Sequence, residues 1–328
     1  MQCRLRQCHL RLVAAVLGCA ALGACASAGS MSGAVSENAF PVQPEGTAPR
    51  AYVRYFPQRD DDIAWENDRT AFRIYGPELE TAAPPFSSGI DAWGKKVRTP
   101  ILNKWYAAGE HAYHYDRGEG MDGYKTGASR GAGGVGVWDT DDKKLYVSHD
   151  WGTYKILHNG PDYVSFRVTY APWRVSTPAE PVSNPGAPGR KVWQVTVITL
   201  PMGSNLNRIT TTLYSNEPGE ITVGVGLATH GVTDGILGHP GNGRITYWDK
   251  ADSAPDDKNN NGYMGAAEIV NPAQLAGEVH TDSDNLLLIK AQPGVPFTYY
   301  AGACWSNGLD FHNNEQWDAY VKAFAAKF

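Results

Sequence analysis

The sequence predicts an all-β protein, built mainly from antiparallel strands and closed by one helix at its C-terminus. Segments in which apolar and polar residues alternate recur along the chain, and this period of two is typical of half-buried strands. Clusters of Gly and Pro separate the segments, most densely at residues 177–189. Because no helices alternate with the predicted strands, the pattern favours packed antiparallel sheets over a doubly wound fold.

The predicted strands all lie beyond residue 140. In chain order they are Leu145–Val147, Asp162–Tyr170, Val192–Leu200, Arg208–Tyr214, Glu220–His230, Leu286–Ile289 and Phe297–Tyr300. After them, apolar residues follow helical spacing and predict the terminal helix, with Asn313 as its N-terminal cap: Trp317, Tyr320, Val321, Phe324 and Phe328.

The composition is that of a folded globular chain. Its 328 residues are 42% hydrophobic and 19% charged, which excludes a wholly disordered protein. No shift in composition divides residues 51–328, so we expect one β-sandwich catalytic domain there. The formal charge of −5 makes bulk attraction to nucleic acid unexpected.

The first 24 residues predict a lipoprotein signal peptide. Three arginines precede an apolar run at residues 10–22, which is too short to span a membrane, and the run ends in Leu22-Gly23-Ala24-Cys25. We expect cleavage before Cys25 and a lipid on its thiol. The alternative is an ordinary signal peptide cut near Ala26 to Ser30. In both cases the protein is exported, either lipid-anchored to the outer membrane or periplasmic.

Residues 25–50 are rich in Ala, Ser, Gly and Pro and predict a flexible tether. Loss of the leader removes three arginines and no acid, which takes the formal charge from −5 to −8. It also removes every cysteine except Cys25 and Cys304. No disulfide is therefore expected in the mature chain, and we interpret Cys304 as a small buried side chain.

Reactive side chains are densest between residues 113 and 130. His114, Glu119 and Asp122 are followed there by Tyr124, Lys125 and Arg130, and seven glycines fall between residues 113 and 134. We interpret this segment as a loop shaped around a ligand, whose Tyr, His and cationic groups suit acid–base chemistry and anion binding. The alternative is a solvated polar loop.

His230 gains interest from its place on a predicted strand. Small residues occupy the face that it shares in Glu220–His230, including Gly224, Gly226 and Ala228. Small side chains leave room above a sheet, so His230 could stand at the edge of a ligand cleft. A hydrogen-bonded surface histidine is the alternative.

A calcium loop is the one metal-binding pattern in the chain. Asp257, Asn259, Asn261 and Glu268 stand at the spacing of an EF-hand loop around Gly262, and their oxygens are the ligands that Ca²⁺ requires. Flanking helices are not predicted, however. We therefore favour an Asn-rich surface turn without an ion.

Four segments resemble a bacterial family known as domain of unknown function 4861. They are residues 88–93 (Ser-Gly-Ile-Asp-Ala-Trp), 113–120 (Tyr-His-Tyr-Asp-Arg-Gly-Glu-Gly), 129–134 and 200–208. The resemblance runs from about Trp65 to Phe328. It implies a galactose-mutarotase-like β-supersandwich, export or lipid anchoring, and a dehydratase acting on terminal uronic acids of ulvan-type oligosaccharides.

The resemblance and the residues together favour β-elimination at a uronic acid, by a dehydratase or a lyase. Such a reaction needs a cation on the carboxylate, a base at C5 and an acid at the leaving oxygen. We assign Arg130 and Lys125 to the carboxylate, His114 or His230 to the base and Tyr124 to the acid.

The acidic oligosaccharide would be held by side chains outside this set. Trp93 and Trp151 could stack on sugar rings, and four cations could guide its approach: Lys95, Lys96, Arg98 and Lys104. Two alternatives remain open. One is a glycoside hydrolase that uses Glu119 and Asp122, and the other is a glycan-binding lipoprotein without catalysis.

Overall fold

The computed structural model describes residues 48–82, 88–175, 189–231 and 234–328, which belong to one compact unit. The predicted signal peptide, Cys25 and nearly all of the predicted tether lie outside the described residues. Within the described part of the chain, no helix is long and apolar enough to cross a membrane.

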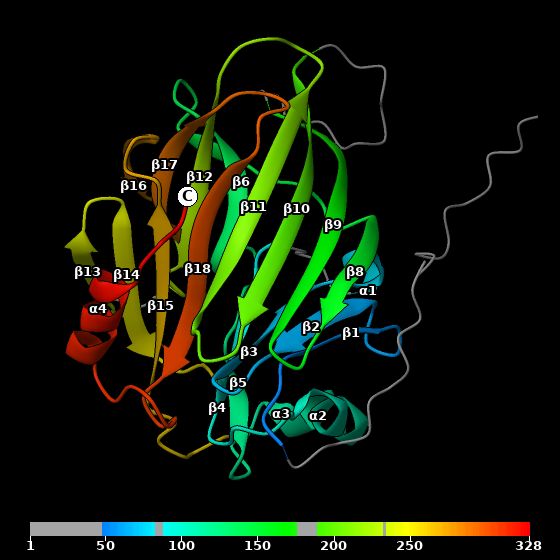
Figure 1. Ribbon diagram of the computed structural model, residues 1–328, viewed down its shortest axis with the longest axis vertical. Coiled ribbons are helices and arrows are strands. Elements are labelled where there is room, and N and C mark those ends of the chain that lie inside the picture. Colours follow the sequence, from blue (N-terminus) through cyan, green and yellow to red (C-terminus); the bar gives the residue numbers. More distant parts are fainter. Residues whose placement is uncertain (1–47, 83–87, 176–188, 232–233) are drawn as a thin grey trace, which may run out of the picture. The chain divides into compact units, whose positions relative to one another are not determined.

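Antiparallel strands form three sheets, which confirms the predicted fold class (Figure 1). The N-terminal sheet runs in chain order through β1 (Tyr52–Phe56), β2 (Asp62–Glu66), β3 (Thr70–Ile74), β4 (Asp91–Lys95) and β5 (Gly120–Tyr124). The small sheet has the order β16 (Leu275–His280), β17 (Asp284–Ala291), β12 (Ile221–Ala228), β6 (Ala132–Asp139) and β7 (Lys144–Tyr146).

The large sheet has eight strands. Their order is β13 (Ile236–Gly241), β14 (Arg244–Lys250), β15 (Tyr263–Val270), β18 (Phe297–Trp305), β11 (Leu206–Ser215), β10 (Lys191–Pro201), β9 (Tyr163–Arg174) and β8 (Thr153–Asn159). Pairing between β11 and β18, which are far apart in the sequence, joins the two halves of this sheet. Such a non-local register cannot be predicted from the alternation of apolar and polar residues alone.

The large and small sheets pack face to face. On β10 every second residue is buried, as the alternation predicts, and Ile198 joins Val223 of β12 and Leu287 of β17 in one apolar core. The N-terminal sheet adds Trp65 to that core, where its indole nitrogen donates to Asn207 Oδ1 over 2.7 Å. The second face of the N-terminal sheet therefore has to be covered by something else.

Two helices that the sequence analysis did not predict cover that face. They are α2 (Leu102–Ala108) and α3 (Glu110–Tyr113), and α1 (Pro77–Ala82) follows β3. Trp105, Tyr106 and Tyr113 from α2 and α3 pack with Phe56 and Trp93 in a second apolar cluster. The loop expected from residue 113 onward is also shorter than predicted, because β5 and β6 run through it.

The predicted C-terminal helix is confirmed as α4 (Asn314–Ala323). Asn313 caps it by accepting from the Gln316 amide over 2.9 Å, and Trp317 and Val321 are buried beneath it. The helix packs on β13, β14 and β15, on the outer face of the large sheet, where Cys304 is buried as predicted.

Candidate functional site

A buried arginine gathers three carboxylates within the N-terminal sheet. Arg73 on β3 is 2% exposed. Its Nε lies 2.8 Å from Asp91 Oδ2, its Nη2 lies 3.0 Å from Asp122 Oδ2, and its Nη1 lies 3.5 Å from Asp62 Oδ2. We call Arg73 and these three aspartates the Arg73 cluster. Each acid comes from a different strand, so only the folded sheet brings them together.

Burial raises the pKa values of two carboxyl groups in the Arg73 cluster. Burial, and then the neighbouring Asp91, raises the pKa of Asp122 well above its usual value. Burial also raises the pKa of Asp62 to about 6, although Arg73 and Arg59 oppose this shift. Carboxyl groups with raised pKa values next to cations are a common feature of acid–base sites.

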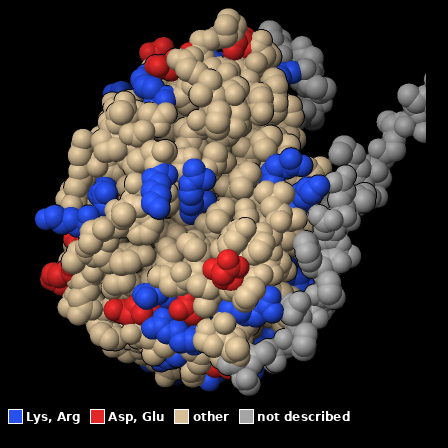
Figure 2. Space-filling model, in the orientation of Figure 1, with Lys and Arg blue, Asp and Glu red and all other residues tan. Residues whose placement is uncertain are grey.

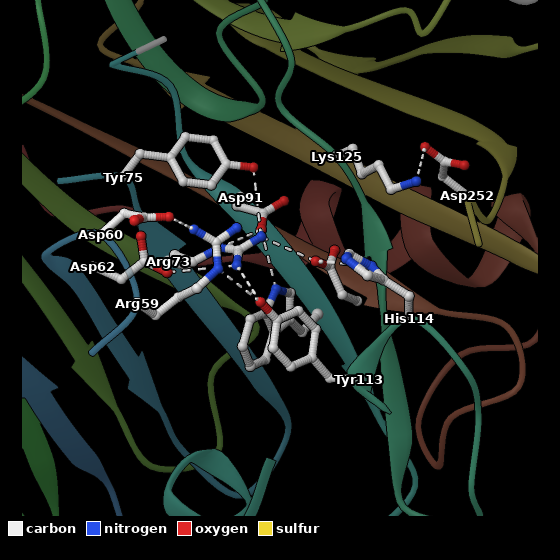
Figure 3. Close-up of polar contacts among 12 residues, drawn as sticks. Arg59, Asp60, Asp62, Arg73, Tyr75, Asp91, Tyr113, His114, Lys125 and Asp252 are labelled. Carbon is white, nitrogen blue, oxygen red and sulfur yellow. Dashed lines mark hydrogen bonds and ion pairs between the residues drawn. The ribbon is translucent and has the colours of Figure 1, made fainter. Parts of the chain in front are cut away.

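Two side chains connect the Arg73 cluster to its surroundings. Tyr113 accepts hydrogen bonds on its phenolic oxygen from Arg73 Nη1 over 3.2 Å and from Arg59 Nε over 3.3 Å. His114 is 19% exposed, and its Nδ1 lies 3.5 Å from Asp122 Oδ2. Figure 3 shows both side chains directed at the cluster, with Tyr75 on its opposite side.

The hydrogen bonds that the Tyr113 hydroxyl accepts limit what else it can do. A phenolic hydroxyl has two acceptor lone pairs and one donor proton. Two guanidinium groups use the acceptor capacity of Tyr113, so its remaining function is to donate. Burial raises the pKa of Tyr113 even though Arg73 and Arg59 oppose the shift, which keeps that proton in place at neutral pH.

A cleft of about 310 Å³ opens beside the Arg73 cluster, a volume at the lower end for small-molecule sites. Tyr113 belongs to both the cleft and the cluster. The other lining residues are a mixture of aromatic and charged side chains with small residues between them: Lys104, Trp105, Ala108, Ala112, Tyr115, Arg117, Gly118, Glu119 and Gly120. A polar ring with hydroxyl and carboxylate groups would match this lining.

The structure brings together three of the residues singled out in the sequence. His114 and Asp122 meet at the cluster, and Lys125 lies nearby with its Nζ 3.1 Å from Asp252 Oδ2 (Figure 3). Lys96 makes contacts elsewhere: its Nζ forms an ion pair with Asp116 and lies 5.0 Å from the centroid of the Trp305 ring.

Both ring nitrogens of His230 are held by polar neighbours in the fold. Its Nδ1 lies 2.6 Å from Asp249 Oδ2, and its Nε2 lies 2.8 Å from the Lys125 carbonyl. Burial opposes a charge on this ring, but the hydrogen bond to Asp249 outweighs it and the pKa of His230 is raised. Because both nitrogens face acceptors, the ring is held protonated and is unsuited to act as a base.

Tyr124 and Arg130 are enclosed in the core. Tyr124 is 0% exposed and donates to the Ala228 carbonyl over 2.9 Å. Arg130 is 1% exposed and donates to Ser88 Oγ over 3.0 Å. Neither side chain can reach a substrate in this placement, which corrects the roles of acid and carboxylate partner expected for them.

The two tryptophans expected to stack on sugars are also interior. Trp93 and Trp151 are both 0% exposed. Trp93 is stacked between side chains of its own cluster, with Trp105 and Tyr113 on it at centroid distances of 5.6 and 5.0 Å. Neither ring presents a face to solvent. Lys95 is likewise buried, with its Nζ 2.6 Å from Glu66 Oε2.

The carboxylates of the hydrolase alternative do not form an exposed pair. Glu119 is engaged with Lys104, whose Nζ lies 2.7 Å from Glu119 Oε1, whereas Asp122 is 0% exposed and bound to Arg73. A hydrolase needs two carboxyl groups that flank the same glycosidic bond. This geometry gives that alternative no support.

The calcium-loop residues are separated. Asp257, Asn259 and Asn261 form a turn, with Asn261 Nδ2 donating to Asp257 Oδ2 over 2.9 Å. Glu268 instead lies inside β15, is 0% exposed and accepts from the Leu287 amide over 3.1 Å. Glu268 therefore does not complete a calcium loop with the three residues of the turn. In the described residues, no group of three or more His, Cys, Asp or Glu side chains could hold a metal ion.

Sequence reasoning missed most of this site. Arg59, Asp62, Arg73 and Tyr75 were not considered. Tyr113 was included only as the first residue of the dense segment, without a role of its own, and Asp91 was noted only within a family segment. One signal was available: Arg73 interrupts the otherwise apolar strand Thr70–Ile74, and a charge in a buried strand requires a charged partner.

The fold and the site define a β-sandwich protein with a buried cluster of one arginine and three aspartates beside a surface cleft. A model of the family described as "Domain of unknown function (DUF4861)" matches residues 24–328. The chain belongs to this family, which confirms the resemblance. It is 30% identical over 285 residues to "Uncharacterized protein P7" of Formosa agariphila, a match that covers 84% of this chain and 67% of that protein.

Two solved structures are distantly similar. A chain assigned as a kojibiose phosphorylase from the human microbiome has a TM-score of 0.37 and 9% identity, covering 78% of this chain and 33% of its own. The galactosidase domain of the α-galactosidase–sucrose kinase AgaSK has a TM-score of 0.32 and 10% identity, covering 76% of this chain and 41% of its own. The match to this chain therefore covers less than half the length of each of these two proteins.

Proposed function

We propose that the chain is a carbohydrate-active enzyme that performs β-elimination at uronic acid residues of acidic oligosaccharides, as a dehydratase or a lyase. The observation that carries the proposal is the adjacency of a proton donor and a proton acceptor. Tyr113 is restricted to donation by two arginines, and His114 next to it is oriented by a buried carboxyl. The family resemblance supports the substrate class.

The proposed reaction assigns one task to each group. His114 takes the C5 proton through Nε2, because its Nδ1 faces Asp122. The electrons of the broken C5–H bond form a C4–C5 double bond as the C4–O bond breaks. Tyr113 then donates its proton to the departing oxygen, which leaves as water from a dehydratase or as a sugar hydroxyl from a lyase.

Cations near the cluster would neutralise the substrate carboxylate, which is what makes the C5 proton removable. Arg59 is 15% exposed on its side chain and Lys125 is 35% exposed. Both are more accessible than Arg73, which is held by its own carboxylates. We therefore transfer the role first given to Arg130 to Arg59, and retain Lys125.

Cleavage before Cys25, lipid attachment there and a tether to residue 50 are the remaining parts of the proposal. They would place the enzyme outside the cytoplasm, where it would encounter acidic polysaccharides. Mass spectrometry of the membrane fraction tests this directly, since a lipidated N-terminal Cys25 peptide is expected and an intact leader would contradict it.

The catalytic test measures the ultraviolet absorbance of unsaturated uronyl products after incubation with saturated uronic acid oligosaccharides. His114→Asn should lower kcat by about 100-fold or more, the usual contribution of a general base. His239→Asn is the matched control, because that side chain is 55% exposed and pairs with Glu278 on another part of the surface.

Two results would overturn the proposal. Wild-type protein that yields no absorbing product from any saturated uronic acid glycan rules out elimination, and measurable binding in the same samples would favour the glycan-binding alternative. Equal turnover by His114→Asn and His239→Asn would remove the histidine from the mechanism.

A further inference from the structure

Two lysines at the candidate site form ion pairs with acidic side chains. The pairs are Lys104–Glu119 in the cleft and Lys125–Asp252 beside the Arg73 cluster. Figure 2 shows acidic and basic side chains next to one another in the lower part of the view, where Figure 1 draws the N-terminal sheet with α2 and α3. An acidic sugar that enters the site therefore meets lysines that already have anionic partners.

Of the two acids, Asp252 is the one that can turn most easily into water. Its side chain is 43% exposed, against 32% for Glu119. Glu119 also accepts from the Trp105 indole over 3.4 Å, whereas the other contact of Asp252 is with the amide of its neighbour Ser253. Ion pairs between exposed side chains contribute little to stability, so Asp252 can leave Lys125 at small cost.

The backbone around Asp252 is fastened to the candidate site. Asp252 belongs to the loop that joins β14 to β15. Its amide donates to the Gly123 carbonyl over 2.9 Å, and two residues later the Ala254 amide donates to the His114 carbonyl over 3.3 Å. These bonds fix the position of the Asp252 backbone next to the site, while its exposed side chain can still rotate.

Lys125 and Asp252 both act on the carboxyl that orients His114. Burial is the main cause of the raised pKa of Asp122, and Asp252 adds an upward shift to it while Lys125 adds a downward one. Coulombic effects weaken with distance, so this ion pair lies close to the groups that the proposed reaction uses. Figure 3 shows Lys125 and Asp252 directed at each other, on the same side of the cluster as His114.

We propose that Asp252 is a competitor built into the site, whose carboxylate occupies on Lys125 the position that the substrate carboxylate takes on binding. This inference rests on the proposed function, which assigns Lys125 to the uronic acid. Binding breaks the Lys125–Asp252 ion pair, forms one between Lys125 and the sugar, and leaves Asp252 in water. The Ser253 carbonyl accepts from Lys125 Nζ over 3.3 Å and holds the ammonium in place during the exchange.

The competition makes the site selective for carboxylates that belong to a sugar. Because Asp252 is tethered beside Lys125, its effective concentration there is high, on the order of millimolar or more. A simple anion such as acetate gains only the contact that Asp252 already makes. A uronic acid also gains contacts of its ring in the cleft that Tyr113 lines, and these offset the loss of the internal ion pair.

Calorimetry with saturated trigalacturonate measures the competition as a dissociation constant. All proteins carry His114→Asn, so that the sugar stays intact. Adding Asp252→Asn should lower Kd by about threefold to fivefold at low salt, the range that an exposed ion pair supplies. Adding Glu220→Gln is the matched control and should leave Kd within twofold, because that carboxylate is 45% exposed and pairs with Lys290 of β17 over 3.2 Å.

The methyl ester of the same trisaccharide separates charge from shape. It carries no carboxylate, so Asp252→Asn should leave its Kd within twofold. Equal tightening of both ligands would mean that the substitution has reshaped the site and would overturn the inference. An unchanged Kd for trigalacturonate, or no measurable binding to any of the proteins, would overturn it as well. Acetate should weaken trigalacturonate binding more in Asp252→Asn than in its parent, and an equal effect would contradict the selectivity.

Failure of the proposed function would look different. Wild-type protein that forms no unsaturated product removes elimination, but a gain in affinity confined to the charged ligand would still identify Asp252 as the competitor at an anion site. In an active enzyme with His114 intact, Asp252→Asn should lower KM for trigalacturonate while kcat stays within twofold. Turnover with an unchanged KM would keep the proposed function and remove this inference.

Discussion

Replacing Arg73 with methionine should strongly destabilise the fold. The substitution leaves Asp62, Asp91 and Asp122 buried at 0% exposure without the guanidinium that Arg73 places among them. Removing one partner from a buried ion pair typically costs 3–5 kcal/mol. We expect a loss of about 4 kcal/mol at neutral pH, or about 10 °C in Tm for a domain of this size.

The pH dependence of this loss has a definite sign. Burial raises the pKa values of Asp62 and Asp122, and Arg73→Met removes the guanidinium that opposes both shifts. The penalty is therefore present at higher pH and disappears as pH falls and these two groups become protonated. The difference in Tm between variant and wild type should therefore narrow toward pH 4. Thermal unfolding of both proteins from pH 4 to 8 measures this difference.

Arg167→Met is the matched control, because it removes an exposed arginine of β9 that lies outside the Arg73 cluster. It should change stability by less than about 0.5 kcal/mol. An Arg73→Met protein within 1 kcal/mol of the wild type at pH 7 would refute the view that Arg73 neutralises the cluster.

Three further predictions concern single groups. The free energy of unfolding of the wild type, compared with that of Asp62→Asn, should fall by about 3 kcal/mol as pH rises from about 4 to 6, because the pKa of Asp62 is raised from 3.8 to about 6. Urea melts of both proteins measure this difference, and a difference that does not change with pH would contradict the prediction. His230→Phe should cost about 3 kcal/mol by leaving Asp249 unpaired in the interior. The contribution of His230 is full below its unfolded pKa of 6.5 and is lost as pH rises through its raised folded pKa, so an unchanging deficit up to alkaline pH would count against it. Calcium chelation should leave Tm unchanged, because Glu268 is buried away from the Asp257 turn; a lower Tm would restore the calcium loop.

The bare face around His230 shows why a correct pattern did not lead to a correct site. The alternation on β12 was right, and Gly224 and Gly226 do share one face with Ala228. The space above them is filled, however: a Cβ on Gly226 would lie 2.7 Å from Arg130 Cγ. Gly226 makes room for the stem of the buried Arg130 side chain. The position of Arg130 next to β12 could not be known from the sequence of β12 alone.

The candidate site was predictable only in its local part. His114, Asp122 and Lys125 are close in sequence, so one dense segment pointed to all three. The other members of the Arg73 cluster come from β2, β3 and β4, about 30 to 60 residues before Asp122 in the chain. Each partner is an ordinary charged residue within a short strand, and nothing local marks the register that aligns Arg73 with Asp91.

The sequence by itself determined the period of the strands, the capped C-terminal helix and the family. The strand period and the helix follow from short-range physics, since alternation, helical spacing and an Asn cap each involve residues within a few positions. Only the tertiary structure decided which strands pair, and so which polar side chains meet. It buried Trp93 and Arg130 and joined Arg73 to three aspartates, because the burial and pKa of a side chain depend on neighbours from distant segments.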